Sequence, residues 1–119
     1  MNAQTLFLML KELHVEIYSK EGRIFIKGDN EVLATIVPIL NLYKAVLQQY
    51  FAHEILEYTY IFNERAGIYE FESGLSTEDA EHQAMNEIVT LYSDQNKVSI
   101  YSTKAKQFIN QFRTEVNYV

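Results

Sequence analysis

Histidines and their neighbouring carboxylates are the residues of this sequence whose types suit metal-dependent catalysis. The stretch His53-Glu54-Ile55-Leu56-Glu57 comes nearest to the zinc-protease pattern H-E-x-x-H. Glu57 stands where the second histidine ligand is required, so the pair of facing imidazoles is missing. His14 and His82 are scattered, and His82 among its acidic neighbours suits only adventitious metal binding. We therefore predict no metal site.

Patterns for phosphate binding and nucleophilic catalysis are also missing from the sequence. The four glycines lie too far apart to form a phosphate-binding loop. Ser76 lies in G-L-S-T-E, not in G-x-S-x-G, and is typical of a helix cap. The chain has no cysteine, which excludes a thiol nucleophile and cysteine-ligated zinc. We predict no catalytic residue and no cofactor, and we expect a protein that is not an enzyme.

The length and composition indicate one folded domain. The chain has 119 residues, of which 48% are hydrophobic, whereas proline and glycine together number five. We predict an α+β fold, mostly helical, with a small antiparallel β-hairpin packed on helices. Its expected parts are a docking-like helix-hairpin-helix segment over 1–52, an acidic helical hairpin over 53–93 and a C-terminal strand and helix over 94–119.

The hairpin is predicted from a change in hydrophobic period. Val15 and Ile17, and then Ile24 and Ile26, alternate with polar and aromatic residues on either side of a Lys-Glu-Gly turn. These four residues would share the buried face, and the residues between them would share the outer face.

Helical spacing of apolar residues predicts the other elements. Pro38 is expected to start a helix, because a first turn does not need its missing N–H. Gly74 and Ser76 suit the end of one helix and the cap of the next, so a tight corner is expected there. The predicted helices cover 5–13, 31–37, 38–51, 53–73, 77–93 and, after a short strand or extended link at 98–101, about 103–116.

Residues 6–51 resemble the N-terminal docking domain of TubC-type nonribosomal peptide synthetases. The resemblance rests on L-F-L-M-L-K-E-L-H-V-E-I-Y at 6–18, R-I-F-I at 23–26 and Y-K-A-V-L-Q-Q-Y-F at 43–51, where Lys44 matches a lysine of the closing helix. It implies a helix, a β-hairpin and closing helices that pair with themselves and receive a partner's short tail on the hairpin. Gly28-Asp29-Asn30 replaces the family's usual Pro-Gly link and L-T-P-E-like helix start.

A second stretch, E-R-A-G-I-Y-E-F-E-S-G-L-S-T-E-D-A-E at 64–81, is similar to a helical corner of small bacterial proteins from prophages, plasmids and replication-related genes. Both resemblances together imply an accessory protein of a bacterial mobile element. A synthetase fragment is less expected, since a large enzyme would follow the docking domain and this chain ends at Val119. Residues 94–119 match neither pattern.

The outer face of the hairpin is the first candidate binding surface. Aromatic side chains stand there among bases, where an exposed strand is normally polar. An edge strand of this kind can add an extended acidic peptide as a further strand. The alternative is that Tyr18 and Phe25 pack under the C-terminal helix. The predicted partner-binding residues are Ile17, Tyr18, Lys20, Arg23, Phe25 and Lys27.

Acidic residues between 53 and 87 form the second candidate surface. Nine acids stand there against Arg65 alone, whereas the rest of the chain has seven acids and nine bases. Such a surface suits a phage- or plasmid-encoded inhibitor that mimics nucleic acid and blocks a nucleic-acid-binding enzyme. The alternative is a solvated helix face. The residues assigned to this surface are Glu64, Glu70, Glu72, Glu78, Asp79 and Glu81.

Direct binding of nucleic acid is not expected of a chain with a net charge of −6. The helix after Ser76 begins with carboxylates, which repel phosphates although the corner resembles a helix-turn-helix. A third hypothesis assigns DNA contacts to spaced bases of the C-terminal region. These bases are Lys97, Lys104, Lys106 and Arg113.

Self-association is expected because the helix over 53–71 is apolar around more than one side. The predicted partners are therefore another protein and a second copy of the chain in a homodimer. The N-terminus lacks the features of a signal peptide, and no run approaches the ~18 apolar residues of a membrane span. We predict a cytoplasmic protein without a membrane partner.

Overall fold

The computed structural model describes residues 1–118, and their contacts divide the chain into two compact units. Unit 1 comprises Met1–His53 and unit 2 comprises Glu54–Val119. The structure is mostly helical with one antiparallel hairpin, which confirms the predicted α+β class. The sequence predicted one domain made of three segments, and in the structure each unit has a core of its own. The boundary lies next to the predicted end of the docking-like segment at residue 52.

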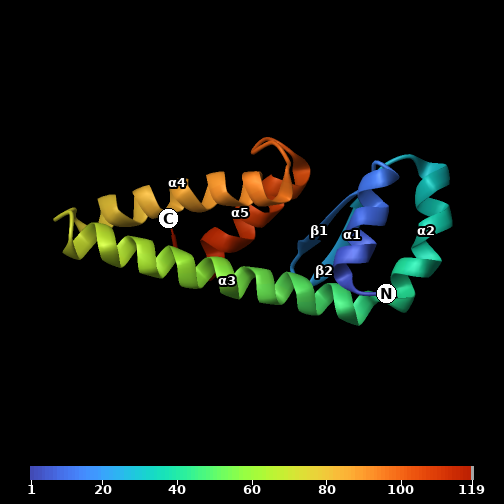
Figure 1. Cartoon of the computed structure of the whole chain (residues 1–119), viewed down its shortest axis with the longest axis horizontal. Coiled ribbons are helices and arrows are strands. Elements are labelled where there is room, and N and C mark those ends of the chain that lie inside the picture. Colours follow the sequence, from blue (N-terminus) through green and yellow to red (C-terminus); the bar gives the residue numbers. More distant parts are fainter. Residues whose placement is uncertain (119) are drawn as a thin grey trace. The chain divides into compact units, whose positions relative to one another are not determined.

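Unit 1 starts with a capped helix that leads into the hairpin (Figure 1). The Asn2 side chain accepts a hydrogen bond from the backbone N–H of Thr5 at 2.9 Å, which satisfies one of the helix's unpaired donors. Apolar side chains of the first helix and the hairpin face the same core, together with the next two helices. The elements are α1 (Ala3–Glu12), β1 (Glu16–Lys20), β2 (Arg23–Lys27), α2 (Asn30–Leu42) and the start of α3 (Lys44–Phe71).

Pro38 lies inside α2, so the prediction that it starts a helix is wrong. Asp29 caps α2, and its Oδ1 accepts from the N–H of Glu31 at 3.0 Å. Proline removes the bond that its N–H would have made to the carbonyl of Ala34. Both Ala34 and Pro38 lie on the exposed side of the helix, where water can solvate that carbonyl.

The break falls at Tyr43 instead, where the chain bends by 83° between α2 and α3. Leu40 before the bend and Leu47 after it are both buried in the core of unit 1. The 28-residue α3 replaces the two helices predicted over 38–51 and 53–73. An apolar pattern that continues without a breaker cannot show where one helix should be divided.

Unit 2 contains the second part of α3, then α4 (Thr77–Asn96) and α5 (Thr103–Glu115). The predicted corner is confirmed, because Gly74 has a φ of +69° and the Ser76 hydroxyl accepts from the N–H of Asp79 at 3.1 Å. In Figure 1, α4 returns alongside α3, and α5 packs against this pair. Residues 98–101 form an irregular link that ends in a turn, so of the two alternatives considered from the sequence the strand is wrong.

Aromatic rings fill the core of unit 2. Tyr92 and Phe108 stack with ring centroids 3.9 Å apart, and Phe112, which is fully buried, stacks on Phe108 at 5.6 Å. Phe62 of α3 meets Phe112 edge-on at 5.7 Å. These rings join all three helices of the unit.

No single helix within the described residues is both long and apolar enough to cross a membrane. Within residues 1–118, α2 and α3 form a bent pair whose combined length and apolar composition are those of a span.

Candidate protein-docking site

The hairpin forms around a tight two-residue turn. Glu21 and Gly22 have φ values of +52° and +76°, the left-handed pair that matches the twist of two-residue hairpins. Lys20 pairs with Arg23, and the register continues with Tyr18 opposite Phe25. This register confirms the predicted division of the hairpin into two faces.

The outer face carries the aromatic pair and most of the predicted bases. The rings of Tyr18 and Phe25 stack with centroids 5.6 Å apart and an angle of 13° between their planes. Phe25 retains 39% of its surface exposed. Lys20, Arg23 and Lys27 are exposed on the same face. Five of the six predicted partner-binding residues therefore share one accessible face.

Ile17 is the exception, and the prediction that it contacts a partner is wrong. Its side chain is only 3% exposed and belongs to the core of unit 1. Ile17 pairs with Ile26, one residue out of phase with Tyr18 and Phe25. Because strand side chains alternate between faces, Ile17 points to the face opposite the aromatic pair.

A groove of about 520 Å³ lies beside β2, between that strand and the helices of unit 1. Its floor combines apolar side chains of the strand and both helices, and its two charged members are cations. The residues that line it are Arg23, Ile24, Ile26, Val37, Leu40, Asn41, Lys44, Leu47 and Gln48.

One contact fixes the end of this groove. The Gln48 side-chain amide donates to the backbone carbonyl of Gly22 at 3.4 Å and so ties α3 to the hairpin turn. Lys44 lies one turn earlier on the same helix, and Arg23 lies one residue after the turn. The two cations and the turn thus belong to the same end of the groove.

The outer edge of β2 offers backbone groups to an additional strand. In an antiparallel pair, hydrogen-bonded residue pairs alternate with pairs that are not bonded to each other. The pair that closes the two-residue turn, Lys20 with Arg23, is of the bonded kind. Alternation then turns the N–H and C=O groups of Ile24 and Ile26 away from β1, beside the groove that their side chains line.

Lys44, Gln48 and Val37 were not predicted as site residues from the sequence. Val37 lies on α2, whereas Lys44 and Gln48 lie on α3, after the bend that follows α2. Lys44 carried the one available signal, as part of the stretch that resembles the docking domains.

The predicted acidic residues do not form one site. Glu64 on α3 and Glu72, which follows the end of α3, are exposed, whereas Glu70 accepts a hydrogen bond from the hydroxyl of Thr77 at 3.0 Å. Glu78, Asp79 and Glu81 border a separate hollow of about 640 Å³ between α4 and the C-terminal segment.

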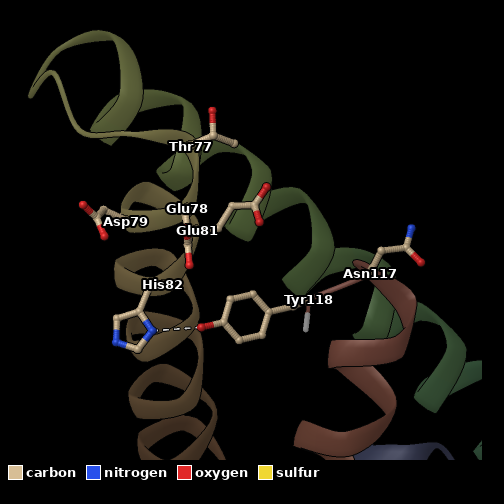
Figure 2. Close-up of a pocket in the computed structure, with 7 residues that line it drawn as sticks. All are labelled: Thr77, Glu78, Asp79, Glu81, His82, Asn117 and Tyr118. Carbon is tan, nitrogen blue, oxygen red and sulfur yellow. Dashed lines mark hydrogen bonds between the residues drawn. The ribbon is translucent and has the colours of Figure 1, made fainter.

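The acidic side chains that border this hollow do not converge on one position. Figure 2 shows the hydroxyl of Tyr118 bonded to Nδ1 of His82, at 2.9 Å, and shows Asp79 pointing away from Tyr118. Within residues 1–118, no cluster of three or more histidine and acidic side chains could hold a metal ion.

A carboxylate joins α3 to α4 further along the helical hairpin. Glu87 accepts a hydrogen bond from the Tyr69 hydroxyl, and its other oxygen lies 3.8 Å from Nε of Arg65. The hydrogen bond to Glu87 raises the pKa of Tyr69 above its usual value, because the bond and the negative charge both favour the protonated phenol. This arrangement connects two helices and leaves no acid–base pair in a cavity.

The C-terminal bases are divided between surfaces. Lys106 and Arg113 are exposed and seven residues apart on α5, so they share one face, while Lys104 points elsewhere. Arg113 lies over the ring of Tyr118 at 5.4 Å. The helix therefore presents no continuous row of bases.

Comparison with models of known protein families, with characterised proteins and with solved structures gives no match to this chain. The resemblance to TubC-type docking domains therefore remains a hypothesis that depends on the residues quoted above.

Proposed function

We propose that the protein is a docking or adaptor protein, in which unit 1 receives an extended acidic segment of a partner protein as a third strand along β2. The groove beside this strand supports the proposal most strongly, since it combines apolar walls with two cations and an open strand edge. Backbone bonds to Ile24 and Ile26 would provide affinity, and the groove would select alternate side chains of the guest.

Charge defines the chemistry of the expected guest. Arg23 and Lys44 line the groove without an acidic neighbour among its lining residues, and Lys20 and Lys27 stand nearby on the hairpin. A guest with carboxylates beside these cations would gain charge-assisted hydrogen bonds. We propose that the adaptor works in the cytoplasm as an accessory protein of a bacterial mobile element, a role that the two resemblances support.

A library of short random peptides displayed on phage tests this proposal with the full-length protein as bait. We expect the selected peptides to alternate apolar residues with Asp or Glu. Their binding should be lost in the double variant Arg23→Glu/Lys44→Glu and retained in Lys11→Glu, which reverses an exposed base on α1 outside the groove. Basic consensus peptides, or equal binding to both variants, would contradict the proposal.

A second candidate function is inhibition of a nucleic-acid-binding enzyme by the acidic unit 2. Unit 2 has eleven acids and five bases, whereas unit 1 has five of each, so the whole net charge of −6 belongs to unit 2. Reversal of Glu70, Glu72, Glu78 and Glu81 to lysine should abolish binding to a basic target, and added salt should weaken it steeply. A complex insensitive to salt would favour docking at the hairpin.

A further inference from the structure

The second part of α3 is apolar on two opposite faces. One face, with Ile55, Tyr58 and Phe62, is buried in the core of unit 2. The opposite face carries Leu56, Tyr60 and Phe71, which are 62%, 70% and 86% exposed. With Asn63 and Gly67 these three residues follow the helical repeat, and we call the set the outer stripe.

Gly67 is unexplained within a single copy of the chain. A glycine inside a helix destabilises it relative to alanine, so it normally marks a place where another group comes close. Nothing lies within 4 Å of the position that a Cβ would occupy at Gly67. The space above this residue is therefore open, in the middle of the outer stripe.

We propose that the outer stripe binds the outer stripe of a second copy of this chain, with the two α3 helices antiparallel. A twofold axis between positions 63 and 64 places Leu56 against Phe71 of the second copy and Tyr60 against Gly67 of the second copy. Each large side chain thus meets a complementary position, and the same contacts occur twice, as an isologous interface requires. The ring of Tyr60 fills the space that Gly67 leaves open.

The area of the outer stripe suits a weak dimer. Its three large side chains expose roughly 400 Å² per copy, given the usual surface of such residues. Two copies would then bury about 800 Å² through these side chains alone, and their neighbours bring the total toward the ~1,200 Å² lower end of specific interfaces. We expect dissociation on the order of micromolar concentrations.

Charge distinguishes this contact from a contact with a basic partner. The outer stripe contains no ionisable carboxylate or base, but each copy brings a net charge of −6 on unit 2. Two copies therefore repel at long range while their apolar stripes attract at contact. Added salt should tighten the dimer, because screening removes the repulsion and leaves apolar burial.

Sedimentation of the full chain over a concentration series tests this proposal. We expect a shift from 13.9 kDa to twice that mass, and a tighter dimer when salt is raised from about 0.05 M to about 0.5 M. Gly67→Leu should weaken the dimer at least tenfold without lowering the thermal stability of the monomer, since leucine favours a helix more than glycine does. Asn86→Leu, which adds leucine at an exposed position of α4, is the matched control and should dimerise normally.

The double variant Leu56→Gln/Tyr60→Gln should also remain monomeric with an unchanged circular dichroism spectrum. A wild-type chain that is monomeric at every concentration would overturn the proposal. So would a dimer that tolerates both Gly67→Leu and the double variant, or one that dissociates in high salt. Peptide binding at β2 should be unaffected by these substitutions, so this result is independent of the proposed docking function.

Discussion

The two units differ in how they use a similar supply of apolar residues. Unit 2 fills its core with aromatic rings from three helices and carries the whole net charge of the chain. Unit 1 balances five acids with five bases and leaves a groove beside a strand edge, with cations at one end. The comparison indicates that the fold of unit 2 depends on its buried rings, whereas unit 1 combines its core with a surface suited to a guest.

The largest expected effect is a loss of stability caused by a substitution in the aromatic core of unit 2. Phe112→Ala should lower the free energy of unfolding of that unit by about 3–5 kcal/mol, because it leaves a cavity among stacked rings. Amide hydrogen exchange measured residue by residue should show the loss in α4 and α5. Protection in the hairpin should change less, since its side chains pack in a separate core. Equal losses in both units would contradict two separate cores.

The second-largest expected effect is a loss of peptide affinity in a variant of unit 1. Arg23→Glu combined with Phe25→Ala should weaken a selected acidic peptide on the order of 100-fold, through a lost charge pair and lost ring contact. The circular dichroism spectrum should stay unchanged, because both side chains are exposed. Calorimetric titration measures the affinity. Affinity within twofold of the unmodified protein would place the guest elsewhere.

A smaller effect concerns the corner of unit 2. Ser76→Ala should lower the free energy of unfolding by about 1 kcal/mol, because the N–H of Asp79 loses its capping oxygen. Ser76→Asp restores an acceptor and is the matched control. Thermal denaturation should separate the two variants, and peptide binding at β2 should be the same for both.

The smallest effect is the pH dependence that comes from Tyr69. Its pKa is raised in the folded protein by the hydrogen bond to Glu87, so the protonated phenol is favoured by folding. The resulting stabilisation is complete below the usual pKa of tyrosine, about 10, and is lost as the pH rises through the higher folded-state value. Tyr69→Phe should therefore have a lower free energy of unfolding than the unmodified protein at neutral pH, and the two values should converge in strong base. A difference in the free energy of unfolding that stays constant across this pH range would exclude the hydrogen bond.

Local signals in the sequence predicted the hairpin, the capped corner and both hairpin faces. Alternation around Glu21-Gly22 and the pair Gly74 and Ser76 act within a few residues, so neighbours alone determine them. The prediction that Pro38 starts a helix was wrong, because water can solvate the carbonyl that loses its hydrogen bond to proline. Whether water reaches that carbonyl depends on its burial in the fold, and the neighbouring residues in the sequence do not show it.

The groove could not be predicted from local sequence signals, because its residues are brought together by the tertiary fold. Lys44 and Gln48 reach β2 only because the chain turns by 83° at Tyr43, and this bend lets Leu40 and Leu47 enter one core. Ile17 was assigned to the binding surface although its alternation with Tyr18 already placed it on the buried face. The period-two rule was sufficient to exclude it.

Hydrogen exchange at the edge of β2 tests the docking hypothesis most directly. In the free protein, the amides of Ile24 and Ile26 should exchange faster than that of Phe25, which the hairpin register bonds to Tyr18. When a selected acidic peptide is bound at saturation, Ile24 and Ile26 should become as protected as Phe25. Peptide binding that leaves both isoleucine amides unchanged, or that protects amides of unit 2 instead, would contradict the proposed third strand.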